Sequence, residues 1–130
     1  MIHRIRSKSN KRLIIECKVN DKYAYFLLDT GATVGLIHYN KHKEYDLKVG
    51  KRFNGTLVGA GGEMSNIRYC DTFVEFEGKK IPQFLLADIS SVIKSIKKET
   101  NIEILGIISL PQMRITGIGI DANDMEIIIE

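Results

Sequence analysis

The sequence predicts a mostly β protein, folded as a barrel or a sandwich, with one or two short helices. Two observations lead to this prediction. Short apolar or alternating segments recur along the chain, and turn-forming residues separate them. One segment, around residues 89–99, instead has apolar side chains at helical spacing.

The first half of the chain contains the clearest strand patterns. Residues 12–20 and 23–29 predict a hairpin around a turn at 20–22. Residues 32–39 are again rich in β-forming side chains. Residues 55–69 predict two strands that flank a glycine-rich tip.

The second half adds the helices. Residues 72–88 alternate apolar and polar side chains and turn at Gly78. We expect a helix over 91–99, capped by Ser90 and followed by lysines that suit the C-terminal end of its dipole. The apolar run 101–113 is expected to end in a short helical piece at Pro111. Residues 114–121 and 125–130 predict two strands around a turn at 122–124.

Length and composition favour an intracellular globular protein. The 130 residues suit one domain, residues 1–130, with its own hydrophobic core. The basic N-terminus has an apolar stretch of only Leu13, Ile14 and Ile15, too short for a secretory signal, so we expect a cytoplasmic protein. Cys17 and Cys70 should then stay reduced, and no cysteine or histidine spacing predicts a metal site.

Charge is unevenly distributed along the chain. Residues 1–52 carry 12 Lys and Arg against 5 Asp and Glu, whereas residues 53–130 carry 7 against 11. A basic segment of this kind can contact nucleic acid. The basic residues are not interleaved with aromatic ones, as a single-strand binding groove requires, so a solvated surface is the preferred interpretation and a nucleic-acid partner is not expected.

An apolar strand that ends on a carboxylate is the most informative feature. Asp29 follows the run from Phe26 to Leu28, and a carboxylate there should be paired, hydrogen-bonded or functional. Gly31 allows a backbone N–H to approach the acid, the Thr30 hydroxyl can brace the loop, and Ala32 leaves room. Asp-x-Gly is also common in ordinary turns, so this short pattern alone leaves both interpretations open.

The longer string from Leu27 to Thr33, Leu-Leu-Asp-Thr-Gly-Ala-Thr, resembles the active-site motif of the retropepsin-like aspartic proteases. Three further segments follow in that family's order. Residues 58–62 resemble the tip of its flap hairpin, 104–106 its second hydrophobic-hydrophobic-Gly element, and 119–129 its closing strands. The resemblance spans about residues 11–130. The helix at 91–99 is longer than in the compact viral enzymes, so the chain is more similar to bacterial and cellular members.

The resemblance implies a closed β-barrel of the acid protease type and a set of site residues. It assigns catalysis to Asp29, Thr30 and Gly31. It assigns substrate binding to Ala32, Val58, Gly59, Ala60, Gly61 and Gly62. It assigns support of the active-site loop to Leu28, Leu105 and Gly106. No cofactor or metal is implied, and the substrate is an extended polypeptide.

The mechanism of this family requires two facing carboxylates. At close range both cannot ionise comfortably, so the pair shares a proton and activates a water. The chain has one Asp-Ser/Thr-Gly sequence, which predicts a homodimer with one Asp29 from each subunit and the Thr30 hydroxyls meeting across the axis. The apolar tail 126–129 pairs either across the dimer or within its own subunit.

Other interpretations lead to different classes of function. The fold is also compatible with a catalytically silent dimerisation or peptide-binding module, and the basic segment with an anion-binding or nucleic-acid-binding barrel. The glycines at 59–62 also fit an ordinary hairpin loop. His38 and His42 are expected at the surface, since no third ligand accompanies them, and Leu28 and Ile37 in the core.

Overall fold

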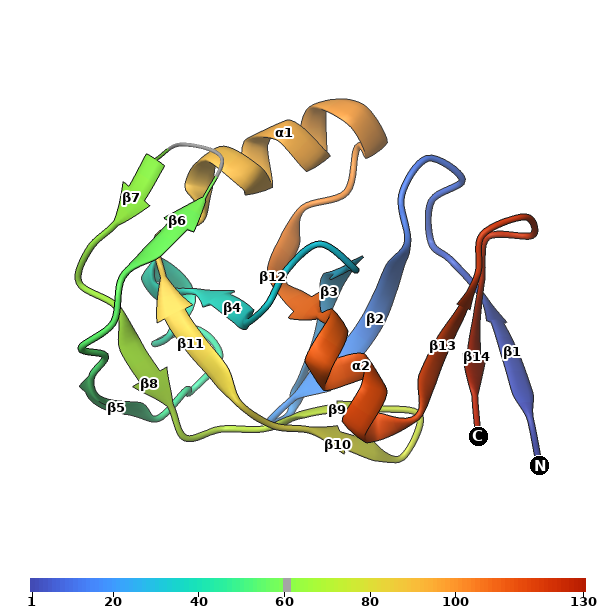
Figure 1. Cartoon of the computed structure of the whole chain (residues 1–130), viewed down its shortest axis with the longest axis horizontal. Helices are drawn as coiled ribbons and strands as arrows, with labels where there is room; N and C mark the ends of the chain where they lie inside the picture. The colour runs from blue at the N-terminus through green and yellow to red at the C-terminus, as the bar shows by residue number, and fades with distance from the viewer. Residues whose placement is uncertain (60–61) are drawn as a thin grey trace.

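The computed structural model describes residues 1–59 and 62–130 and has a mostly β architecture with two short α-helices (Figure 1). A nine-stranded mixed sheet forms its main body. In spatial order the strands are β10 (Lys79–Ile81), β9 (Val74–Phe76), β2 (Ile14–Val19), β3 (Lys22–Asp29), β12 (Ile104–Ser109), β4 (Gly35–His38), β11 (Phe84–Ala87), β8 (Arg68–Cys70) and β5 (Val49–Arg52). Most neighbours are antiparallel, but β3 pairs with β12, and β4 with β11, in parallel.

The predicted closure of the barrel is not confirmed. Within the described residues the ladder of the main sheet runs from β10 to β5, and these two end strands do not pair with each other. The hairpin of residues 12–29 is confirmed as β2 and β3, with Ile14 opposite Leu27. β5 was not predicted, because Val49–Arg52 has neither an apolar run nor a clear alternation.

Strand β3 lies at the centre of the core because both of its edges are paired and half of its residues are buried. Phe26 is fully buried and lies against Phe84 of β11, with ring centroids 5.7 Å apart. Leu28 and Ile37 are buried in the same cluster, as predicted. Burial of such side chains stabilises the fold by about 1.5–3 kcal/mol each.

Helix α1 (Ser90–Thr100) confirms the predicted helix and covers part of the main sheet. Its apolar residues Val92, Ile93 and Ile96 pack on β3 and β12. The predicted cap at Ser90 is wrong. Ile89 is the capping residue, and the Ser90 hydroxyl and N–H both donate to Asp88 Oδ1, at 2.6 and 3.0 Å. The helix ends at Asn101, which takes a left-handed conformation.

Helix α2 (Leu110–Thr116) confirms the short helical piece but extends into residues that were predicted as a strand. Ser109 caps its N-terminus and Pro111 lies in its first turn. Gly117, at φ 72°, ends the helix, so residues 114–116 are helical and the next strand begins only after this glycine.

The two ends of the chain form a separate three-stranded sheet, in the order β1 (His3–Arg6), β14 (Glu126–Ile129) and β13 (Ile118–Asp121). Figure 1 shows the termini side by side at this sheet. Strand β1 was not predicted. Strand β14 pairs on both edges within its own chain, which is the intramolecular alternative for the apolar tail.

The remaining elements are a 3-10 turn, η1 (Tyr39–Lys41), and the hairpin of β6 (Leu57–Gly59) and β7 (Gly62–Met64). Among the described residues, no helix combines the length and the apolar character needed to cross a membrane.

Candidate active site

The Asp29 carboxylate lies where the buried second half of strand β3 meets the surface. Strand β3 carries the buried residues Phe26, Leu27 and Leu28 and ends at Asp29, which is half-buried. The next two residues, Thr30 and Gly31, are exposed. A rigid strand therefore places one carboxylate at the edge of the core while leaving it open to solvent.

The loop after Asp29 orients this carboxylate through the backbone. The Gly31 N–H donates to Asp29 Oδ1 at 2.9 Å, and the Ala32 N–H donates to the Asp29 carbonyl at 3.1 Å. A Cβ on residue 31 would lie 3.3 Å from Oδ1, so the glycine gives the amide its close approach. One carboxylate oxygen is held by this bond and the other remains available.

Two elements far away in sequence support the loop. Strand β12 runs parallel to β3 and places Ser109 beside Asp29. The Leu110 N–H then donates to the Ala32 carbonyl at 3.2 Å, which connects the first residue of α2 to the loop. Ser109, at the end of β12, and Leu110, at the start of α2, therefore support the Asp29 loop.

The predicted support residues Leu105 and Gly106 lie earlier on β12. Gly106 is opposite Phe26, three positions before the residue that flanks Asp29. A Cβ at Gly106 would clash with the Leu36 carbonyl and the Phe26 ring, so this glycine permits close strand packing in the core. Leu105 shares the main core cluster with Leu28. In this structure the contact with the loop comes from Ser109 and Leu110, and the sequence analysis missed both.

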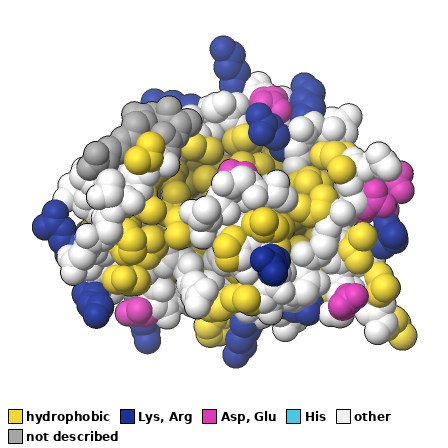
Figure 2. Space-filling view, in the orientation of Figure 1, with side chains coloured by type: hydrophobic (Ala, Val, Ile, Leu, Met, Phe, Trp, Pro, Cys, Tyr) yellow, Lys and Arg dark blue, Asp and Glu magenta, His cyan; other side chains and the backbone are white. Residues whose placement is uncertain are grey.

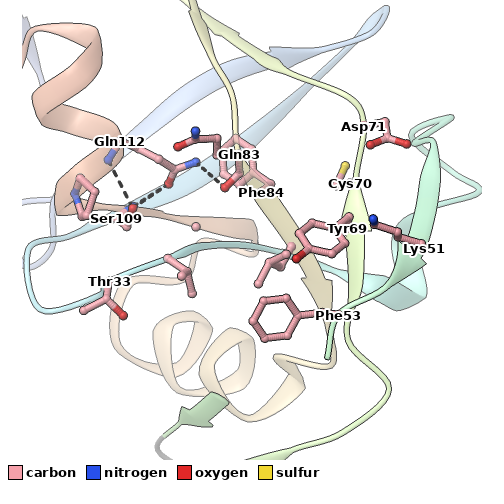
Figure 3. Close-up of a pocket in the computed structure, with 14 residues that line it drawn as sticks. Thr33, Lys51, Phe53, Tyr69, Cys70, Asp71, Gln83, Phe84, Ser109 and Gln112 are labelled. Atoms are coloured by element: carbon pink, nitrogen blue, oxygen red, sulfur yellow. Dashed lines mark hydrogen bonds between the residues drawn. The ribbon is translucent and has the colours of Figure 1, made fainter. Parts of the chain in front are cut away.

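A buried glutamine joins this support to the neighbouring strand. Gln112 is 2% exposed, and its Oε1 accepts from the Ser109 N–H at 2.9 Å and from the Ser109 hydroxyl at 3.0 Å. Its Nε2 donates to the Pro82 carbonyl at 2.7 Å, just before β11. It also contacts the Gln83 carbonyl at 3.4 Å (Figure 3). Its side chain occupies the space where a Cβ on Gly35 would stand. The only signal in the sequence is the Ser-x-x-Gln spacing of a capping box.

Arg12 places a positive charge near Asp29. The Leu28 N–H bonds the Leu13 carbonyl at 2.9 Å, and continuing the β2–β3 register brings Arg12 opposite Asp29. Its guanidinium is held by Glu99 at the end of α1, with contacts of 2.8 and 3.0 Å. The pKa of Arg12 is raised, mainly by these bonds and to a smaller extent by the charge of Asp29.

A cavity of about 720 Å³ opens beside the Asp29 loop. Figure 2 shows hydrophobic side chains gathered in a hollow of this face. Its walls come from the start of β4, the strands β5, β8 and β11, and the first turn of α2 (Figure 3). The lining residues are Thr33, Val34, Gly35, Lys51, Phe53, Tyr69, Cys70, Asp71, Gln83, Phe84, Leu85, Ser109, Pro111 and Gln112. Asp29 itself is not among them; Thr33 and Ser109 connect the cavity to its loop.

The hairpin of β6 and β7 lies where the resemblance places a flap. Val58 pairs with Glu63, and Gly59 pairs with Gly62. Val58 is 79% exposed, an unusual position for a large apolar side chain. Of the predicted substrate-binding residues, Ala60 and Gly61 lie outside the described residues. Ala32 and Val58 are not among the residues that line the cavity.

The prediction of two surface histidines is wrong for His38. His38 ends β4 and is 6% exposed, because α1 and the residues before it cover this end of the strand. His42 is half-buried, and its Nδ1 lies 2.8 Å from the Tyr39 carbonyl. The two rings therefore lie in different environments and have different hydrogen-bond partners.

Comparison with known proteins decides the family. A model of the aspartyl protease family matches residues 15–107, which include Asp29, its loop and most of the main sheet. The chain belongs to the aspartyl protease family. A search of curated protein sequences gives no match.

Several solved structures of proteases and protease-like domains have a similar fold. The EIAV protease, complexed with the inhibitor HBY-793, has a TM-score of 0.62 at 20% identity, over 87% of this chain and 95% of that one. A retropepsin-like aspartic protease from Rickettsia conorii has a TM-score of 0.60 at 18% identity, and the match covers 99% of this chain and 98% of that one. The retroviral protease-like domain of Ddi1 from Leishmania major has a TM-score of 0.55 at 19% identity, and the match covers 85% of this chain and 81% of that one. The fold is therefore retropepsin-like.

Proposed function

We propose that this protein is an aspartic endopeptidase that acts as a homodimer, with one Asp29 from each subunit. The observation that carries the proposal is the fixed but open carboxylate at the end of β3, held by the Gly31 amide at 2.9 Å. Membership of the aspartyl protease family supports it. The proposed catalytic residues are Asp29, Thr30 and Gly31, and the proposed domain is the whole chain.

In the proposed mechanism, two Asp29 carboxylates face each other and share one proton. The ionised carboxylate takes a proton from a water molecule as that water attacks the scissile carbonyl. The protonated carboxylate donates to the carbonyl oxygen, which gives a tetrahedral diol. The amide nitrogen then receives a proton as the C–N bond breaks. The pair titrates as a unit, and the Gly31 amides keep both carboxylates in place.

The proposed substrate is an extended polypeptide with a large apolar side chain near the cleaved bond. The cavity beside the Asp29 loop offers apolar walls from Val34, Phe84 and Leu85. Phe53 and Tyr69 add an aromatic pair, with centroids 5.6 Å apart in an edge arrangement. Such a site gains most from burying an aromatic or branched aliphatic side chain.

The proposed dimer must form without exchange of the C-terminal strand. Both edges of β14 are used within the chain, by β1 and β13. Leu110 remains 40% exposed, and its N–H bonds the Asp29 loop directly. We therefore place the proposed contact at the Asp29 loop and the first turn of α2, where an exposed leucine gains from burial.

Cleavage of a peptide library at micromolar protein tests the proposed activity. We expect wild-type protein to cut extended peptides and Asp29→Asn to lose at least about 1,000-fold in rate, because Asn can neither accept nor donate the proton. Circular dichroism should show the same fold for both. Full activity in Asp29→Asn would exclude the aspartic mechanism. A dimeric wild-type protein without any cleavage would favour the silent module.

Sedimentation across a range of concentrations tests the dimer. We expect a concentration-dependent dimer, and we expect Leu110→Asp to weaken it at least about tenfold, because a charge would replace a buried apolar contact. Lys98→Asp, an exposed charge change on α1, is the control. A strict monomer at high concentration would contradict the proposal, since one carboxylate would lack its partner.

A further inference from the structure

A second cavity, of about 410 Å³, lies beside α1 and shares no lining residue with the cavity next to the Asp29 loop. This volume falls within the range of small-molecule sites. Its lining residues are Tyr23, Ala24, Tyr25, His38, Lys41, Tyr45, Ser90, Ile93, Lys94, Glu103, Ile104 and Leu105. Three tyrosines and three large aliphatic residues thus surround a few polar groups.

The polar group at this cavity that points to a ligand is the His38 ring. Its side chain is only 8% exposed. The Ile89 N–H donates to Nδ1 at 3.2 Å, so Nδ1 acts as an acceptor and the ring proton lies on Nε2. Within residues 1–59 and 62–130, every fully buried side-chain nitrogen or oxygen atom has a hydrogen-bond partner. Nε2 has no such partner among these residues, so it is not fully buried. Nε2 therefore reaches solvent, and the cavity is the open space that His38 lines.

Asp88 does not change this assignment. Its Oδ1 lies 4.0 Å from Nδ1. The same oxygen accepts bonds from the hydroxyl and the N–H of Ser90, which lower the pKa of Asp88. A proton on Nδ1 would face the Ile89 N–H, so this hydrogen bond leaves Nε2–H as the donor of the ring.

The charged side chains at the cavity nearly balance, and Lys94 offers an ammonium group for an anionic ligand. Lys41 and Lys94 line it, against a single carboxylate, Glu103. Lys41 is paired with Glu44 at 3.3 Å, whereas Lys94 has no salt bridge in the described part of the chain. Burial raises the pKa of Tyr45, so its phenol stays neutral. The imidazole N–H, the phenol and the ammonium group can each donate a hydrogen bond to a carboxylate. The tyrosine rings suit a flat apolar body.

We propose that this cavity binds a small aromatic carboxylate, with His38 Nε2–H and Lys94 on the carboxylate and the tyrosine rings around the aromatic body. The site lies outside the proposed catalytic groups, so ligand binding does not require peptidase activity. A protein that does not bind the ligand could still be a peptidase, and an inactive protein could still bind the ligand, so the two proposals are tested separately.

Imidazole nitrogen spectra of the whole protein test the proposal, with benzoate as the probe. The chain has three histidines, and His3→Gln and His42→Gln assign the signals. Without ligand, His38 should show the Nε2–H tautomer. Benzoate should shift its signals saturably, with a dissociation constant of about 1 mM or lower. Lys94→Gln should weaken binding about fivefold, the size of one partly exposed ion pair, whereas Lys97→Gln on the same helix should not.

Four results would overturn the proposal. The first is no saturable shift up to about 10 mM benzoate. The second is an equal response to benzamide, which has the same shape without the charge. The third is a response to inorganic phosphate but not to benzoate. The fourth is an equal loss from Lys94→Gln and Lys97→Gln, which would indicate general charge effects and no defined site.

Discussion

Strands β3 and β4 of the main sheet each end on a polar side chain that a backbone N–H contacts, and the two side chains differ in burial. Strand β3, parallel to β12, ends at Asp29, and strand β4, parallel to β11, ends at His38. Both side chains interact with a backbone N–H, from Gly31 for the aspartate and from Ile89 for the histidine. Asp29 remains half-exposed beside an open loop, whereas His38 is covered as the chain enters α1.

The source of the N–H explains this difference. Asp29 bonds an amide two residues away, so its orientation is set by a local loop and needs no other element. His38 bonds an amide 51 residues away, which arrives only when the segment before α1 packs on the sheet. Here the local bond leaves the Asp29 carboxylate half-exposed, whereas the distant bond accompanies the burial of most of the His38 side chain.

The largest expected effect concerns Gln112, which supports the Asp29 end of β3 through Ser109. Gln112→Ala should lower the free energy of unfolding by about 3 kcal/mol, because it opens a cavity and leaves the Pro82 carbonyl and the Ser109 N–H without their buried partner. Urea unfolding measures this loss. Arg114→Ala, an exposed position on the same helix, should stay within about 0.5 kcal/mol. Equal losses would mean that the glutamine bonds contribute nothing specific.

A reciprocal pair of variants tests the comparison directly. His38→Ala should cost about 2 kcal/mol of unfolding free energy, since the Ile89 N–H loses its buried acceptor. Asp29→Ala should change stability by about 0.5 kcal/mol or less, because its loop is exposed. The same unfolding assay serves both. If the aspartate variant proved the less stable one, the strand ends would not differ in the way the burial suggests.

The smallest effect concerns Arg12 and Glu99, which connect the Asp29 end to α1. The side-chain bond from Arg12 lowers the pKa of Glu99 in the folded protein. The pair therefore adds stability above the unfolded-state pKa of about 4.3, and this stability is lost as the pH falls through the lower folded-state value. Thermal melting of Glu99→Gln should show a slightly lower midpoint than wild type at neutral pH and no difference in strong acid. A constant difference at all pH values would contradict the ion pair.

Local patterns predicted the parts of this protein that depend on neighbours in sequence. The hairpin of β2 and β3 and the helix α1 follow from apolar spacing and turn residues. The family also follows from a short motif, since the Asp29 loop is shaped by the glycine and the alanine next to it. Strands β1 and β5 were missed because their residues are largely polar and pair only with distant strands.

The sequence by itself determined the Asp29 loop and the retropepsin-like order of the elements, because each rests on residues a few positions apart. Tertiary structure decided what surrounds them. It brought Ser109 beside Asp29, joined Gln112 to Pro82, and buried His38 under the segment that leads into α1. It also placed β14 between β1 and β13 of the same chain. The physical reason is that segments far apart in sequence compete for the same buried surface or strand edge. Which segment makes each contact depends on how the whole chain packs.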